Sequence, residues 1–158
     1  MTLTVEPIRK KGIFSEYKIE DVCSLYDIPY HPADPLRQFP RFDCTGEPID
    51  DKLLSYIVDE LQYRLAATPI FDTSEAYKSV YVYFILLAIV RTVCPMLQVL
   101  PERYIEDFQA KGKADYSIEE DGEILGVTEV KRRDYVQGVA QNAMQIRPAL
   151  EFNRRRAG

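Results

Sequence analysis

The fold is decided by residues 112–145, GKADYSIEEDGEILGVTEVKRRDYVQGVAQNAMQ. Residues 114–120 and 123–131 are strand-like runs, and the Asp121-Gly122 dipeptide that joins them is a strong signal for a β-hairpin turn. Beyond the second run, apolar residues return at helical spacing from Tyr135 to Ile146. The stretch therefore predicts a β-hairpin followed by a helix.

Three charged side chains of this hairpin are candidates for a common site. Glu129 and Lys131 lie two residues apart, so they share one face of the second strand. A two-residue loop would place Asp115 opposite Thr128, on the other face of the sheet. A three-residue loop, with Gly122 in the left-handed conformation, would place Asp115 on the same face as the other two side chains. We expect the three-residue loop.

Two converging carboxylates beside a lysine favour a divalent-cation site. Oxygen ligands from Asp115 and Glu129, together with the backbone carbonyl of Val130, suit Mg²⁺ or Mn²⁺. Such a metal lowers the pKa of a bound water and stabilises charge on a phosphoryl oxygen. Lys131 would orient that water or neutralise the transition state. The alternative is a solvated sheet face on which the same side chains form cross-strand ion pairs.

The rest of the chain predicts helices and loops around the hairpin. Helical spacing and capping residues predict a short helix at 19–26, one from the Asp50 cap to about Ala67, and one from Asp72 or Ser74 to about Thr92. A short helical or irregular element is expected at 102–108, and four prolines within 29–40 predict an irregular loop. Helices around a small sheet in 158 residues indicate a single α/β or α+β domain.

Composition excludes several classes of protein. Hydrophobic residues make up 46% of the chain and charged residues 28%, which excludes a disordered tail or a coiled-coil rod. A single histidine and three widely spaced cysteines exclude multi-histidine zinc hydrolases and disulfide scaffolds, and they indicate a reducing, intracellular compartment. The apolar run 80–90 is too short for a membrane span, so we expect a buried core element and no membrane partner.

Charge is distributed unevenly along the chain. The net charge is -5, but residues 131–158 contain seven basic and two acidic side chains, which leaves -10 on residues 1–130. An anionic partner is therefore expected at the C-terminal end. The Arg154–Arg156 run there is either a solvated tail or a phosphate anchor.

These motifs resemble those of a known nuclease superfamily. An Asp, then Glu-x-Lys across a hairpin, then a glutamine-bearing helix is similar to the PD-(D/E)xK superfamily, with Ala114-Asp115 where the family has Pro-Asp. The segments GKADYSI, VTEVK and GVAQNAMQI resemble the nuclease domain of Crinkler-type effectors and NTPase-associated nucleases. The resemblance covers about residues 72–150, and it leaves a helical and loop region at 1–71 unmatched and a basic tail at 151–158. It implies an α/β fold with a restriction endonuclease-like core, in which a small mixed sheet with the catalytic hairpin is flanked by helices.

The resemblance also implies roles for residues outside the hairpin. In that family a glutamate begins the upstream helix, and Glu75 has the matching position, where it would complete the metal site. Glu75 is also three residues after Asp72, which is the spacing of a helix-capping box. Gln141 matches a glutamine that binds phosphate or water beside the metal. The side chains expected to contact nucleic acid are Arg132, Arg133, Gln137, Gln145, Arg154, Arg155 and Arg156. The glutamines, four residues apart, also fit a solvated stripe on one helix face.

The implied function is a Mg²⁺- or Mn²⁺-dependent endonuclease, that is, a hydrolase of phosphodiester bonds. DNA is favoured over RNA as the substrate, and no strong sequence specificity is expected, because nothing in the sequence predicts base readout. The alternative is a catalytically inactive nuclease-like module that holds DNA or a partner protein. A homodimer or a larger effector complex is compatible with either function. The expected location is the cytoplasm or nucleus, and a host nucleus for an effector.

Overall fold

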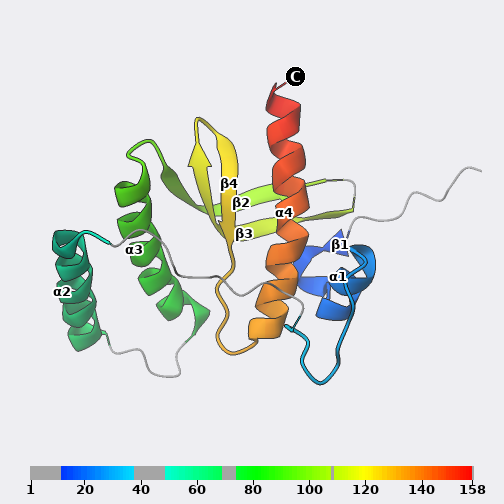
Figure 1. Ribbon diagram of the computed structural model, residues 1–158, viewed down its shortest axis with the longest axis horizontal. Coiled ribbons are helices and arrows are strands. Elements are labelled where there is room, and N and C mark those ends of the chain that lie inside the picture. The colour runs from blue at the N-terminus through cyan, green and yellow to red at the C-terminus, as the bar shows by residue number, and fades with distance from the viewer. Residues whose placement is uncertain (1–11, 38–48, 69–73, 108, 158) are drawn as a thin grey trace, which may run out of the picture.

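The computed structural model describes residues 12–37, 49–68, 74–107 and 109–157, and these form a mixed sheet with helices packed around it (Figure 1). In chain order the elements are β1 (Gly12–Ile13), the 3-10 helix η1 (Phe14–Glu16), α1 (Ile19–Leu25), α2 (Asp51–Ala67), α3 (Glu75–Val93), β2 (Gln98–Glu106), β3 (Ala110–Glu120), β4 (Glu123–Thr128) and α4 (Tyr135–Ala157). The expected mixed α/β architecture is confirmed at this level.

The sheet is organised around β3. Strand β2 runs antiparallel to β3 along nearly its whole length, from Gln98 opposite Glu119 to Glu106 opposite Lys111. The other edge of β3 is shared by β1, which pairs in parallel with its first residues, and by β4, which pairs antiparallel with its second half. The expected hairpin is therefore the β3–β4 pair, and β2 lies at an end of the strand order.

Two apolar clusters hold the helices to the sheet. The larger joins η1, α1 and α4 to the strands through side chains that include Phe14, Val22, Ile105 and Met144, each at most 1% exposed. The second joins α3 to the strands through Val90, Val99, Tyr116 and Val130. Burial of these side chains supplies the main driving force for the fold. Because Val130 belongs to the second cluster, the segment just after β4 is anchored in the core.

Helices α2 and α3 keep much apolar surface exposed. None of the residues of α2 is buried, and this helix packs against α3 at the side of the molecule (Figure 1). The run 80–90, expected to be a buried core element, is buried on one face only, since Val80 and Ile89 are about half exposed. By length and composition α3 could cross a membrane, but core helices of soluble proteins pass the same test, so this evidence is weak.

Two sequence-based expectations are wrong. The segment expected to be a helical or irregular element at 102–108 lies mostly in β2, where Pro101 and neighbouring charges obscure the strand pattern. Proline is tolerated there because β2 is an end strand of the sheet. The helix expected from Tyr135 to Ile146 is longer than expected, because α4 continues to Ala157 past Pro148, whose side chain is fully buried.

The other helix predictions are confirmed within a few residues. Helix α1 matches 19–26, α2 begins after its Asp50 cap, and α3 begins after Ser74. In the proline-rich segment, residues 26–37 lie outside helices and strands, as expected, and residues 38–48 lie outside the described residues.

Candidate functional site

The register of the hairpin places Asp115 beside the end of β4. The turn has two residues, Asp121 (φ 49°) and Gly122 (φ 79°), between the paired Glu120 and Glu123. The expected three-residue loop is therefore wrong. Between the pairs Glu119–Ile124 and Ile118–Gly126, however, Leu125 has no partner and forms a β-bulge.

This bulge shifts the pairing of β3 with β4 by one residue, which is the same shift that a three-residue loop would have produced. Tyr116 therefore lies opposite Thr128, which brings Asp115 level with Glu129. The backbone N–H of Val130 donates to Asp115 Oδ2 over 2.6 Å. The register expected from a three-residue loop is therefore present, and a different local feature produces it.

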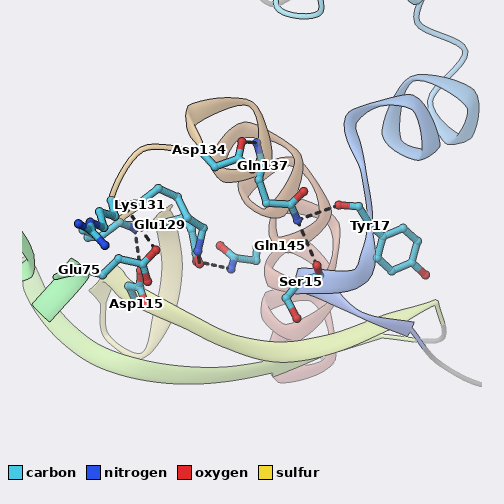
Figure 2. A network of polar contacts seen from close by, with 11 residues as sticks. Ser15, Tyr17, Glu75, Asp115, Glu129, Lys131, Asp134, Gln137 and Gln145 are labelled. Atoms are coloured by element: carbon cyan, nitrogen blue, oxygen red, sulfur yellow. Dashed lines mark hydrogen bonds and ion pairs between the residues drawn. The ribbon is translucent and has the colours of Figure 1, made fainter.

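Glu129 is held from two sides (Figure 2). Lys131 Nζ lies 2.6 Å from Glu129 Oε1, and Gln145 Nε2 donates to Glu129 Oε2 over 2.9 Å. The Glu129 side chain is 5% exposed and that of Lys131 16%. A charged pair at this depth is oriented by its hydrogen bonds and is screened little by salt.

Glu75 connects α3 to the segment after β4. Its Oε1 accepts a hydrogen bond from the Arg132 N–H over 3.3 Å, while Lys78 Nζ donates to the Arg132 carbonyl oxygen. The start of α3 therefore binds both the N–H and the carbonyl oxygen of Arg132, the residue directly after Lys131. Ser74 is the N-cap residue of α3, and Asp72, the partner in the alternative capping box, lies outside the described residues.

The electrostatic environment raises the pKa of Asp115 above its ordinary value of 3.8. Burial is the largest cause, and the nearby charges of Glu129 and Glu75 add to it. The hydrogen bond from Val130 and the charge of Lys131 act in the opposite direction. Asp115 is thus a carboxylate whose negative charge is incompletely compensated by the protein.

The donor atoms fit a hard divalent cation with few protein ligands. Among the described residues no three Asp, Glu, Cys or His side chains lie close enough together to hold a metal ion. Mg²⁺ commonly takes only one or two carboxylates and keeps several waters, so Asp115 and Glu129 suffice as charged ligands. Gln145 Oε1 is fully buried and has no hydrogen-bond partner among the described residues. A hydrated cation beside Glu129 would give this oxygen a water to bind.

The glutamine that reaches the carboxylates is Gln145. Gln141, expected beside the metal, lies one turn earlier on α4 and is 7% exposed. Gly138, one turn earlier again, faces the stem of Lys131: a Cβ there would lie 3.0 Å from Lys131 Cγ. The contacts of Gln145 and Gly138 were not foreseen, and of the stripe Gln137, Gln141 and Gln145 it is Gln145 that contacts Glu129.

Gln137 does not join this group of residues. Its side-chain amide donates to the backbone carbonyls of Ser15 and Tyr17 over 3.1 and 3.0 Å, and Asp134 Oδ1 accepts from its N–H (Figure 2). The side chain therefore ties the start of α4 to the N-terminal segment. Its expected contact with nucleic acid stays a prediction.

The arginines occupy two separate places. Arg132 and Arg133 are exposed and directly follow Lys131. The Arg154–Arg156 run lies on the last turn of α4, where Arg156 donates to the turn carbonyls of Asp121 and Gly122. These residues therefore lie at the opposite end of β4 from Glu129.

Comparison with known proteins indicates one relationship. No family model matches the chain, and no solved structure matches it. The chain is similar to Crinkler effector protein 1 of Rhizophagus irregularis, with 36% identity over 148 residues. The match covers 91% of this chain but only 32% of that protein, so the chain spans about a third of the relative's length. The likeness indicates a Crinkler-like relationship.

Proposed function

We propose, on the premise of this Crinkler-like relationship, that the chain is a metal-dependent endonuclease with a restriction endonuclease-like core. It hydrolyses phosphodiester bonds of nucleic acid, DNA in preference to RNA, without strong sequence specificity. The observation that carries the proposal is the pair Asp115 and Glu129, brought level by the Leu125 bulge and joined to Val130 and Lys131.

In this proposal the metal is Mg²⁺ or Mn²⁺, held by the carboxylates of Asp115 and Glu129 and by the Val130 carbonyl. When bound, it supplies an activated water and neutralises charge on the phosphoryl oxygens. Glu75 orients the strand end through the Arg132 N–H and acts from outside the ligand set.

The other residues of the site hold protons and charges in place. Lys131 donates to Glu129 and is near enough to position the attacking water or to stabilise the transition state. Gln145 fixes the second oxygen of Glu129 and presents its own carbonyl oxygen to a water. Gln141, one turn before Gln145 on α4, assists in binding phosphate or water. Arg132 and Arg133 bind the phosphates that flank the scissile bond.

Cleavage of plasmid DNA in Mg²⁺ or Mn²⁺ tests the proposal. Glu129→Gln and Lys131→Ala should each lower the rate by about 100-fold or more, as expected for loss of a group that stabilises the transition state. Glu123→Gln, an exposed glutamate at the start of β4, and Lys113→Ala, an exposed lysine of β3, are matched controls that should retain activity.

Absence of metal-dependent cleavage above the level of the Glu129→Gln variant would overturn the proposal. If DNA binding persisted in that case, the alternative of an inactive nuclease-like module would replace it. We further propose that the protein acts inside cells, in the cytoplasm or nucleus, and in a host cell if it is an effector.

A further inference from the structure

A groove runs between α2, α3 and the sheet beside the proposed site. It consists of two cavities of about 460 and 500 Å³, which share Arg64, Ala76 and Val80 as lining residues. The first reaches Tyr116 on β3, and the second extends along α2 toward Tyr63. Its position follows from the way α2 lies against α3 (Figure 1).

The lining of the groove combines aromatic faces with a few polar groups. The rings of Tyr83 and Tyr116 stack with centroids 5.4 Å apart, and the Arg64 guanidinium lies over the Phe84 ring at 4.8 Å. Glu60 holds that guanidinium at 2.8 Å. The Ser79 hydroxyl contacts the Tyr116 hydroxyl at 2.5 Å, so the aromatic walls carry hydrogen-bonding groups at this point.

The groove begins within one helical turn of the proposed catalytic residues. Ser74 and Ala76, which line the second cavity, flank Glu75 on α3, and Glu75 accepts a hydrogen bond from the N–H of Arg132, directly after Lys131. Lys78, also on α3, donates a hydrogen bond to the carbonyl oxygen of Arg132. A polymer whose phosphate lies at Asp115 and Glu129 could therefore reach the mouth of this groove.

We propose that the groove binds unstacked bases of single-stranded DNA, and that the preferred substrate is accordingly single-stranded or locally unpaired. The proposal rests on the proposed function for the position of the scissile phosphate. The exposed rings of Tyr63 and Tyr77 can stack on any base, which agrees with cleavage that is not sequence-specific. The paired bases of a duplex are not available for such stacking.

The exposure of the groove rim also favours an occupant. Val80 is 53% exposed, Tyr77 47% and Tyr63 74%, and all three line the groove. Apolar side chains gathered at an open cavity are typical of a binding site. The volume of each cavity admits a planar base together with water.

Binding without metal tests the inference separately from catalysis. The probe is a ten-nucleotide single-stranded DNA with 2-aminopurine at its centre, compared in EDTA with a duplex of the same sequence and with an abasic strand carrying the same phosphates. A stacked base contributes about 1–3 kcal/mol, so the intact strand should bind about 5- to 150-fold more tightly than the abasic strand.

Ala76→Leu places a larger side chain where the two cavities meet and should bring this ratio close to one. Val93→Leu, at an exposed position of the same helix that lines neither cavity, is the matched control and should keep the wild-type ratio. Arg64→Met, which keeps the stem but removes the guanidinium, is a second variant that should lower the ratio. Circular-dichroism melting verifies that each variant is folded.

The outcomes separate the two proposals. Equal affinity of the wild type for intact and abasic strands, or an Ala76→Leu ratio equal to that of the wild type, would overturn the inference even if plasmid DNA is cleaved. A base-dependent ratio lost in Ala76→Leu would support the inference even if no cleavage is found, and the proposed function alone would then fail.

Discussion

Asp115 is the residue whose ionisation the fold disfavours. Because burial raises its pKa above 3.8, the negative carboxylate is less stable in the folded protein than in the unfolded chain. The stability that this residue contributes is fully present below the unfolded pKa and is lost as the pH rises through the folded pKa.

Asp115→Asn should therefore be at least as stable as the wild type at pH 7, and its relative advantage should shrink as the pH falls toward 4. Urea unfolding of both proteins between pH 4 and pH 7.5 measures the difference, with the exposed Asp59→Asn as control. A variant much less stable than the wild type at pH 7 would mean that the ionised carboxylate supports the fold.

The same residue should govern stabilisation by metal. A cation that binds only the folded state raises the free energy of unfolding, by about 2.7 kcal/mol at 100 times its dissociation constant. Thermal melting in millimolar Mn²⁺ should show this gain in the wild type and in Glu123→Gln, and a smaller gain in Asp115→Asn. A melting temperature insensitive to Mn²⁺ in the wild type would contradict a cation site at Asp115 and Glu129.

At the scale of residues, the sequence predicted the partners of the site better than their exact contacts. The nearness of Glu129 and Lys131 follows from strand alternation and the E-x-K spacing, whereas the pairing of Asp115 with Glu129 depends on the Leu125 bulge. The contact of Gln145, rather than Gln141, with Glu129 depends on how α4 rotates about its axis. Packing of Met144 and Gly138 against the sheet and Lys131 sets that rotation, and no local pattern reveals it.

At the scale of elements, the hairpin shows why register is hard to predict. The Asp121-Gly122 signal indicates a turn, yet a two-residue turn and a three-residue loop both fit it. Leu125 decides the register by bulging, and Gly126 beside it, an isolated glycine within the strand run, is only a weak signal of a bulge. Strand β2 was missed for a related reason, because an end strand tolerates Pro101 and alternates imperfectly.

The Gln137 side chain joins α4 to the N-terminal part of the fold. It links α4 to η1 and the residue after it through two hydrogen bonds, to Ser15 and Tyr17. Gln137→Ala should lower the free energy of unfolding by about 1–2 kcal/mol, since two carbonyls lose a donor. Urea unfolding measures the loss, with Gln62→Ala, an exposed glutamine of α2, as the control. Unchanged stability together with weakened DNA binding would instead support the expected contact with nucleic acid.

At the scale of the whole molecule, positive charge occurs at both ends of the β4–α4 region. The six residues of β4 span about 20 Å, with Arg132 and Arg133 beyond one end and Arg154 and Arg155 beyond the other. This distribution opposes the overall charge of -5 and, under the proposed function, would give a long nucleic-acid strand two places at which its phosphates are neutralised. The basic C-terminal end was evident from sequence, but its separation into two places required the helical course of α4.

The salt dependence of binding distinguishes these two places. For a 30-nucleotide single strand, log affinity should fall with log salt by about 0.7 per phosphate neutralised. Replacing Arg132 and Arg133 by alanine should lower the slope by the equivalent of about one to two phosphates. Replacing Arg154 and Arg155 by alanine should lower it by a similar amount. Arg156 is kept because it holds the hairpin turn, so that loss of slope reflects binding and not folding. An unchanged slope in the second double variant would restrict nucleic-acid contact to the end of β4 near Glu129 and leave the last turn of α4 a purely structural role.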